Sequence, residues 1–230
     1  MTKTQIKGFL FDLHGVIADS WQYHLQSWQA VARELQIPWT ADLTRRLPGM
    51  SRRQSLVTIL DSVGQPDRLD AQQFQQMTDH ENELYRQFVA QMTPANRLPG
   101  ITAFLTEVTQ QGYPVALASA STNAPAEIAH LGLTAIFDKI VPAASLPASK
   151  PAPDVYLAAA KLIHQAPAQC VAFEDTTTGV QAAMAAGCLT IGINAQPLTP
   201  VTAMLASTEE LSLPTVQRIL APQAELVAKP

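Results

Sequence analysis

Short, continuous apolar runs rich in β-forming residues recur along the chain, and each of them is followed by small, polar or acidic residues. These runs span residues 6–11, 113–118, 170–173 and 189–193. Continuous apolar strands are typical of a sheet that is covered on both faces. Three helix-compatible segments lie between the runs, at 101–111, 155–164 and 176–186. Gly112 and Gly187 follow two of these segments, as glycines commonly do at helix ends. The alternation predicts an α/β fold with a doubly wound parallel sheet.

Residues 20–92 follow a different pattern, because they contain no convincing strand. Their helix-compatible segments span residues 21–36, 40–47, 52–63 and 71–91. We therefore expect a helical cap domain at 20–92, inserted into a core formed by residues 1–19 and 93–230. Such a cap would close over the carboxyl ends of the strands, where open α/β sheets bind ligands. The last ten residues, 221–230, have a proline near each end and are predicted to be loose.

Composition narrows the class of protein. Hydrophobic residues make up 47% and charged residues 15% of the 230 residues, which predicts a soluble globular protein with a sizeable core. The net charge of −4 and the pI of about 5.7 argue against a nucleic-acid or membrane-surface role. No segment reaches the ~18 apolar residues of a membrane span, and Asp12 and His14 interrupt the N-terminal apolar stretch. Cys170 and Cys188 lie in apolar sequence, so we expect buried free thiols of a reducing compartment, most simply the cytoplasm. We also expect a monomer.

Two candidate site segments follow the first two apolar runs. Asp12 belongs to the segment FDLHGVIAD, residues 11–19. A carboxylate at the end of a buried strand is costly unless it is paired or bound to a metal. Ser119 and Ser121 belong to ASASTNAP, residues 118–125, where hydroxyl and backbone N–H groups before a helix suit a phosphate group. Taken singly, Asp12 is better explained as a turn residue and either serine as an ordinary N-cap.

Two further segments supply charge. Lys150 lies in SKPAPD, residues 149–154, a proline-stiffened loop that would fix its ammonium group against an anion. Glu174 and Asp175 lie in FEDTTTG, at 173–179, and adjacent carboxylates suit a hard cation such as Mg²⁺. Each feature alone is weak, since surface lysines and acids are common. Together the four segments predict a Mg²⁺-dependent phosphotransferase.

This ordered set of motifs resembles the haloacid dehalogenase superfamily of phosphotransferases over essentially the whole chain apart from the tail. Within it, the chain is most similar to the β-phosphoglucomutases. The similar segments are DSWQYHLQSW at 19–28, PGMSRRQSL at 48–56, ALASAS at 116–121 and SKPAPD at 149–154. Those enzymes interconvert β-glucose 1-phosphate and glucose 6-phosphate through a bisphosphate intermediate.

The resemblance implies a role for each candidate residue. Asp12 would be the nucleophile that is transiently phosphorylated. Mg²⁺ would lie between Asp12, the His14 carbonyl, Glu174 and Asp175. The transferring phosphoryl group would be held by Ser119, Ala120, Ser121 and Lys150. In the cap, a distal phosphate and the sugar would contact Arg52, Ser55, His24 and Trp28. The partner expected is a small sugar phosphate.

The chain departs from the family pattern at three positions. His14 stands where the family has a second Asp that acts as general acid and base. Imidazole, with an ordinary pKa of about 6.5, can replace that carboxyl group, or proton transfer is lost and the rate falls by roughly 10²–10⁴. Pro48 and Glu81 stand where the mutases have lysines, and Glu81 is expected to repel a bisphosphate and leave Arg52 alone to hold it. Three hypotheses follow: a mutase, a sugar-phosphate phosphatase, and a catalytically impaired sugar-phosphate binder.

Overall fold

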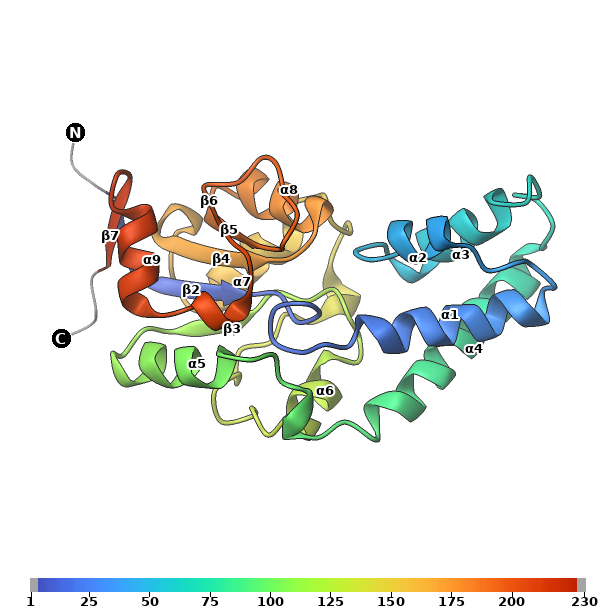
Figure 1. Ribbon diagram of the computed structural model, residues 1–230, viewed down its shortest axis with the longest axis horizontal. Coiled ribbons are helices and arrows are strands. Elements are labelled where there is room, and N and C mark those ends of the chain that lie inside the picture. Colours follow the sequence, from blue (N-terminus) through green and yellow to red (C-terminus); the bar gives the residue numbers. More distant parts are fainter. Residues whose placement is uncertain (1–3, 227–230) are drawn as a thin grey trace. The chain divides into compact units, whose positions relative to one another are not determined.

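The structure is a computed structural model that describes residues 4–226. By its internal contacts the chain divides into two compact units (Figure 1). One, here called the core unit, comprises the residues up to Asp19 and those from Thr93 onward. The other, the helical unit, comprises Ser20–Met92. Among the described residues, no helix is long and apolar enough to cross a membrane.

The core unit is organised around a five-stranded sheet in which every pair of neighbouring strands is parallel. The strand order is β3-β2-β4-β5-β6. These strands are β2 (Gly8–Phe11), β3 (Val115–Leu117), β4 (Cys170–Glu174), β5 (Leu189–Ile193) and β6 (Ala203–Leu205). In the centre of the sheet, Leu10 of β2 is paired with Ala116 on one side and Ala172 on the other. The prediction of a parallel α/β fold is confirmed.

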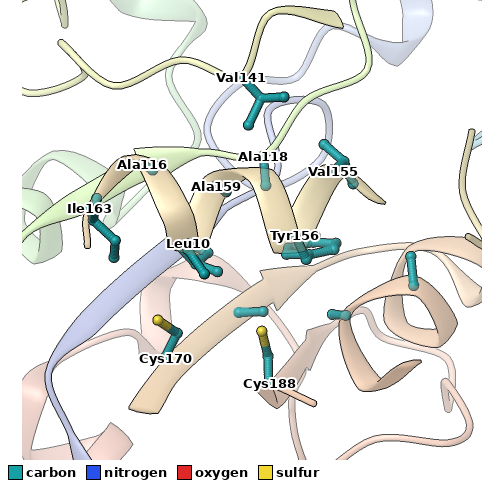
Figure 2. Packing of buried hydrophobic residues seen from close by; sticks show 14 residues of the cluster. Leu10, Ala116, Ala118, Val141, Val155, Tyr156, Ala159, Ile163, Cys170 and Cys188 are labelled. Carbon is teal, nitrogen blue, oxygen red and sulfur yellow. The ribbon is translucent and has the colours of Figure 1, made fainter. Parts of the chain in front are cut away.

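Helices cover both faces of this sheet, and its strands are apolar at most positions on both faces. Phe9, Phe11 and Phe173 pack against Phe104 of helix α5 (Ile101–Gln110). Leu10, the alternate residue of β2, points to the opposite face. Figure 2 shows it packed with Tyr156 of helix α7 (Asp154–Leu162), and Cys170 and Cys188 belong to the same buried cluster. Helix α8 (Thr177–Ala185) packs against α7, and helix α9 (Leu213–Leu220) packs against α5.

Both glycine stops predicted from the sequence are confirmed. Gly112 and Gly187 follow α5 and α8 with φ of 76° and 86°, a left-handed conformation that glycine adopts without a Cβ clash. The other helical elements of the core unit are short. They are helix α6 (Ala124–His130) and the 3₁₀ turns η1 (Pro94–Asn96), η2 (Ala143–Ser145), η3 (Pro167–Gln169) and η4 (Thr208–Glu210).

The first apolar run and the tail differ from the prediction. The run is divided at Lys7 into β1 (Thr4–Ile6) and β2. β1 pairs in parallel with β7 (Ala224–Leu226) in a separate two-stranded sheet. The prediction of a loose tail is therefore wrong for 224–226, because β1 offers backbone groups for a second strand to bond. Residues 227–230 lie outside the described part of the chain.

The helical unit has a hydrophobic cluster of its own. Its helices are α1 (Trp21–Glu34), α2 (Ala41–Arg46), α3 (Arg52–Asp61) and α4 (Ala71–Val89). Thr40, Ser51 and Asp70 are the N-caps of α2, α3 and α4, and each side chain accepts a hydrogen bond from a backbone N–H of the first turn. The buried cluster includes Trp28, Val31, Leu43, Leu56 and Ile59.

Candidate active site

Three of the four predicted site segments meet at one point of the core unit. Asp12 directly follows β2, and Glu174 is the last residue of the neighbouring strand β4. Lys150 Nζ donates a hydrogen bond to Asp12 Oδ1 at 2.7 Å and another to Glu174 Oε1 at 2.5 Å. These side chains are at most 10% exposed. The pairing of β2 with β4 thus brings Asp12 beside Glu174, and the loop before α7 (Asp154–Leu162) places the Lys150 ammonium group against both carboxylates.

The third carboxylate, Asp175, completes a group that fits a divalent cation. One oxygen each of Asp12, Glu174 and Asp175 lie within 4.8 Å of one another. Carboxylate oxygens are the ligands that Mg²⁺ prefers, and three carboxylates around a single ammonium group leave an excess of negative charge. The residues present therefore fit a Mg²⁺ ion.

Two glycines make room for these carboxylates. A Cβ at Gly179 would lie 1.9 Å from Glu174 Oε2, and a Cβ at Gly15 would lie 1.9 Å from Asp175 Oδ2. Gly15 also has a φ of 75°, which side-chain-bearing residues adopt only rarely. Any larger residue at either position would displace a carboxylate of the cluster.

Two residues outside the predicted set, Tyr156 and Asn194, help to hold Glu174 and Asp175 in place. Tyr156 Oη donates to Glu174 Oε1 at 2.7 Å, and the Asp175 N–H donates to Glu174 Oε2 at 3.1 Å. Asn194 Nδ2 donates to the Asp175 carbonyl at 2.9 Å. Asn194 follows β5 directly, so its place at a strand end was the available sequence signal. Tyr156 carried no such signal, because it lies in the middle of a helix.

Burial and charge shift the titration of this cluster. Burial raises the pKa of Asp12 to about 6, against the lowering effect of the Lys150 ammonium and with a further rise from Glu174. Burial by itself would lower the pKa of Lys150, but the Asp12 and Glu174 carboxylates raise it above its ordinary value. The pKa of Tyr156 is raised well above its usual range by burial and by Glu174. Lys150 is therefore a permanent cation, whereas Asp12 is an acid that a second positive charge would help to ionise.

The predicted phosphate-binding segment begins beside Asp12. The Ala118 N–H donates to the Phe11 carbonyl at 2.7 Å, which joins the ends of β3 and β2. Ser119 is buried, and its Oγ accepts a hydrogen bond from the Ser121 N–H at 3.2 Å. Ala120, between them, is exposed. The strand pairing thus places this loop next to the candidate nucleophile.

His14 is buried and faces a carboxylate that the sequence analysis missed. Its Nδ1 lies 3.6 Å from Oε2 of Glu127, which is itself fully buried on α6. Glu127 gave no signal in the sequence, since a single acid in a short helix is normally exposed.

In the helical unit, Glu81 is the centre of a second charged group. Arg52 donates from Nε to Glu81 Oε2 at 2.9 Å and from Nη2 to Asn82 Oδ1 at 2.8 Å. His24 Nδ1 lies 3.2 Å from Glu81 Oε1, and its ring stacks on Tyr85. Glu81 is fully buried. Glu81 is therefore the ion-pair partner of Arg52, and the expectation that it repels a bisphosphate and leaves Arg52 alone to hold it stays a prediction.

The other predicted residues of the helical unit are placed as follows. Trp28 is 3% exposed and belongs to the hydrophobic cluster, which gives it a packing role. Ser55 is buried in α3, whereas Pro48 is half-buried after α2. The predicted substrate contacts of Trp28 and Ser55 stay predictions.

Comparison with known proteins defines the class. Residues 9–193 match the sequence model of the haloacid dehalogenase-like hydrolases, and the chain belongs to this family. It is 34% identical over 209 residues to the β-phosphoglucomutase of Bacillus subtilis (strain 168), covering 90% of this chain and 92% of that one. It is also 30% identical over 213 residues to hexitol phosphatase A of Escherichia coli (strain K12), covering 90% and 94%. Among solved structures, a β-phosphoglucomutase from Clostridium difficile superposes with a TM-score of 0.89 at 30% identity, over 94% of this chain and 98% of the other.

Proposed function

We propose that this chain is a Mg²⁺-dependent sugar-phosphate phosphotransferase that interconverts β-glucose 1-phosphate and glucose 6-phosphate. The observation that carries the proposal is the Lys150 ammonium bridging Asp12 and Glu174, with Asp175 completing a group of three carboxylates. Phosphoryl transfer needs charge neutralisation and alignment above all, and this cluster supplies both. The similarity to β-phosphoglucomutases over nearly the whole chain supports the choice of substrate.

In the proposed reaction, an Asp12 oxygen attacks the phosphorus of a hexose bisphosphate. The bond from phosphorus to the sugar oxygen breaks as the bond to Asp12 forms, and the sugar oxygen takes up a proton. A free hydroxyl of a hexose monophosphate then gives up its proton and attacks the phosphorus of the aspartyl-phosphate. The bond from phosphorus to Asp12 breaks, so that the bisphosphate forms again and the Asp12 carboxylate is free. Bound by Asp12, Glu174, Asp175 and the His14 carbonyl, Mg²⁺ would neutralise charge on the transferring group. Lys150, with Ser119, Ala120 and Ser121, would hold the phosphoryl oxygens.

His14 would carry the proton in this scheme. Its imidazole would donate a proton to the departing sugar oxygen and take one from the attacking hydroxyl. The helical unit would act as the cap that excludes water from the phosphorylated enzyme, with Arg52 and Ser55 on the distal phosphate and His24 and Trp28 toward the sugar.

A phosphatase is the second candidate, and the Arg52–Glu81 pair favours it. A guanidinium that is already neutralised by a carboxylate at 2.9 Å attracts a distal phosphate less strongly. When the sugar phosphate is held weakly, the aspartyl-phosphate waits longer for the sugar hydroxyl. Water therefore has more time to attack it. The similarity to hexitol phosphatase A is consistent with this alternative.

One pair of assays separates these candidates. β-Glucose 1-phosphate with a trace of the bisphosphate and Mg²⁺ should yield glucose 6-phosphate if the chain is a mutase. Free phosphate without isomer would identify the phosphatase. Binding without either product, with turnover gained in His14→Asp, would identify an impaired binder. Asp12→Asn should lower kcat for whichever reaction is found by roughly 10³-fold or more. Retention of activity in that variant would refute the assignment of Asp12 as nucleophile.

A further inference from the structure

Glu127 is a fully buried carboxylate of the core unit that the proposed reaction does not use. It lies on α6, and its Oε2 is 3.6 Å from His14 Nδ1. Its other oxygen, Oε1, accepts a hydrogen bond from Ser121 Oγ at 3.5 Å. A buried carboxylate is costly unless charged or polar groups face it. The imidazole of His14 is one such group, and it is the proposed acid and base.

The pairing depends on the sheet. His14 lies in the loop that follows β2, and Glu127 lies on the helix that follows β3. These two strands are neighbours, with Phe11 paired with Leu117 at their carboxyl ends. The same strand ends carry Asp12 and Ser119. This pairing therefore brings the loop that carries His14 and the helix that carries Glu127 together.

The chemistry of imidazole gives this contact a consequence. A neutral histidine has one N–H and one nitrogen with a free lone pair, and a carboxylate beside one nitrogen favours the proton there. Glu127 beside Nδ1 thus leaves the lone pair on Nε2. The carboxylate also stabilises the positive charge that the ring acquires when Nε2 takes a proton. A carboxylate that orients a histidine in this way need not itself be protonated.

We propose that Glu127 is a positioning residue that fixes the His14 ring with its proton on Nδ1, so that Nε2 exchanges the proton with the sugar hydroxyl. The catalytic part of this statement rests on the proposed function, whereas the position of the ring proton does not. His14 and Glu127 would then act as one unit in the place of a single carboxyl group. A purely structural Glu127 would matter equally whatever residue stood at position 14.

The first test measures the ring proton directly. Nitrogen-15 NMR of the unaltered, metal-free protein, recorded at a pH where the ring shifts have stopped changing, should show the neutral His14 imidazole as the Nδ1–H tautomer. In Glu127→Gln the His14 nitrogen shifts should move toward the tautomer mixture of a free imidazole. A predominant Nε2–H form in the unaltered chain would overturn the proposal. This outcome is independent of whether any substrate is turned over.

The second test is a double-mutant cycle on the holoenzyme with Mg²⁺. Glu127→Gln should lower kcat about 10–100-fold, as loss of an orienting carboxylate commonly does, with little change in KM. In the His14→Asp background the same change should leave kcat within about two-fold, because no ring remains to be oriented. An equal loss in both backgrounds would overturn the proposal. Glu107→Gln is the matched control, since Glu107 accepts a hydrogen bond from the Leu213 N–H at 2.8 Å elsewhere in the core unit. If no variant shows turnover, the proposed function fails and the tautomer measurement still decides the role of Glu127.

Discussion

The core unit and the helical unit each contain a buried charged group, and the two are balanced differently. In the core unit, the Lys150 ammonium contacts Asp12 and Glu174, and a third carboxylate, Asp175, lies within reach of the same point. In the helical unit, one carboxylate, Glu81, is shared by the Arg52 guanidinium and the His24 ring. The first group has more acids than bases, whereas the second is close to neutral.

This difference in charge balance determines which group has a need for a bound cation. An excess of buried negative charge is stable only with a cation, so the core group is suited to a divalent metal and, with it, a phosphoryl group. The helical group is already satisfied by the chain's own residues. An anion that bound to Arg52 would have to compete with Glu81. We therefore expect the chemistry in the core unit, and we expect Glu81 to limit how strongly Arg52 holds a second phosphate.

Among changes that leave Asp12 in place, the largest expected effect comes from removing the Lys150 ammonium group from the core group. Lys150→Ala should lower kcat by roughly 10²–10³, the range typical for loss of one group that stabilises transition-state charge. The same change should tighten Mg²⁺ binding, because a positive charge beside the carboxylates is lost. Steady-state kinetics measure kcat, and calorimetric titration measures the affinity for Mg²⁺. A variant with unchanged kcat would show that the Lys150 bridge is structural only. Lys139→Ala is a control, since Lys139 pairs with Asp138 instead.

An effect of intermediate size is expected on the free energy of unfolding when pH or Mg²⁺ changes the charge of Asp12. The pKa of Asp12 is about 6 in the folded protein and 3.8 ordinarily, so the folded state binds the proton more tightly. Its contribution to stability is present below about pH 4 and is lost as pH rises through about 6. Metal-free protein should therefore lose stability over this range relative to Asp12→Asn.

Mg²⁺ should reverse that loss. At 100 times its Kd a ligand adds about 2.7 kcal/mol, and this gain should be larger at pH 7.5 than at pH 5, where Asp12 is mostly protonated. Thermal unfolding at both pH values, with Mg²⁺ and with a chelator, measures this gain in stability. Equal stabilisation at both pH values would mean that Asp12 is not a metal ligand.

The smallest effect is expected in the helical unit. Glu81→Gln keeps the shape but removes the charge that neutralises Arg52. Because the Arg52 side chain is 30% exposed, we expect a loss of only about 1–2 kcal/mol in unfolding free energy. The freed guanidinium should lower KM for a hexose bisphosphate several-fold and raise the ratio of isomer to free phosphate. Glu83→Gln, on the exposed side of the same helix, is the control. A ratio that does not change would argue against Glu81 as the determinant of distal phosphate binding.

The sequence by itself determined the residues of the core group and the sheet that assembles them. Asp12, Glu174 and Asp175 each follow or end an apolar run, and parallel strands bring their carboxyl ends to one edge whatever lies between them in the chain. The limits of β5 and the glycine stops after two helices were likewise local, because they depend on a few adjacent residues.

Only the tertiary structure decided which side chains meet from different helices. The contacts of Glu127 with His14, of Glu81 with Arg52 and His24, and of Tyr156 with Glu174 join segments whose separation in the sequence has no pattern. The pairing of β1 with β7 is of the same kind, since a three-residue strand is specified by the edge that it joins. Local propensity and periodicity fix elements and their ends, but a buried charge finds its partner through packing, and packing is a property of the whole fold.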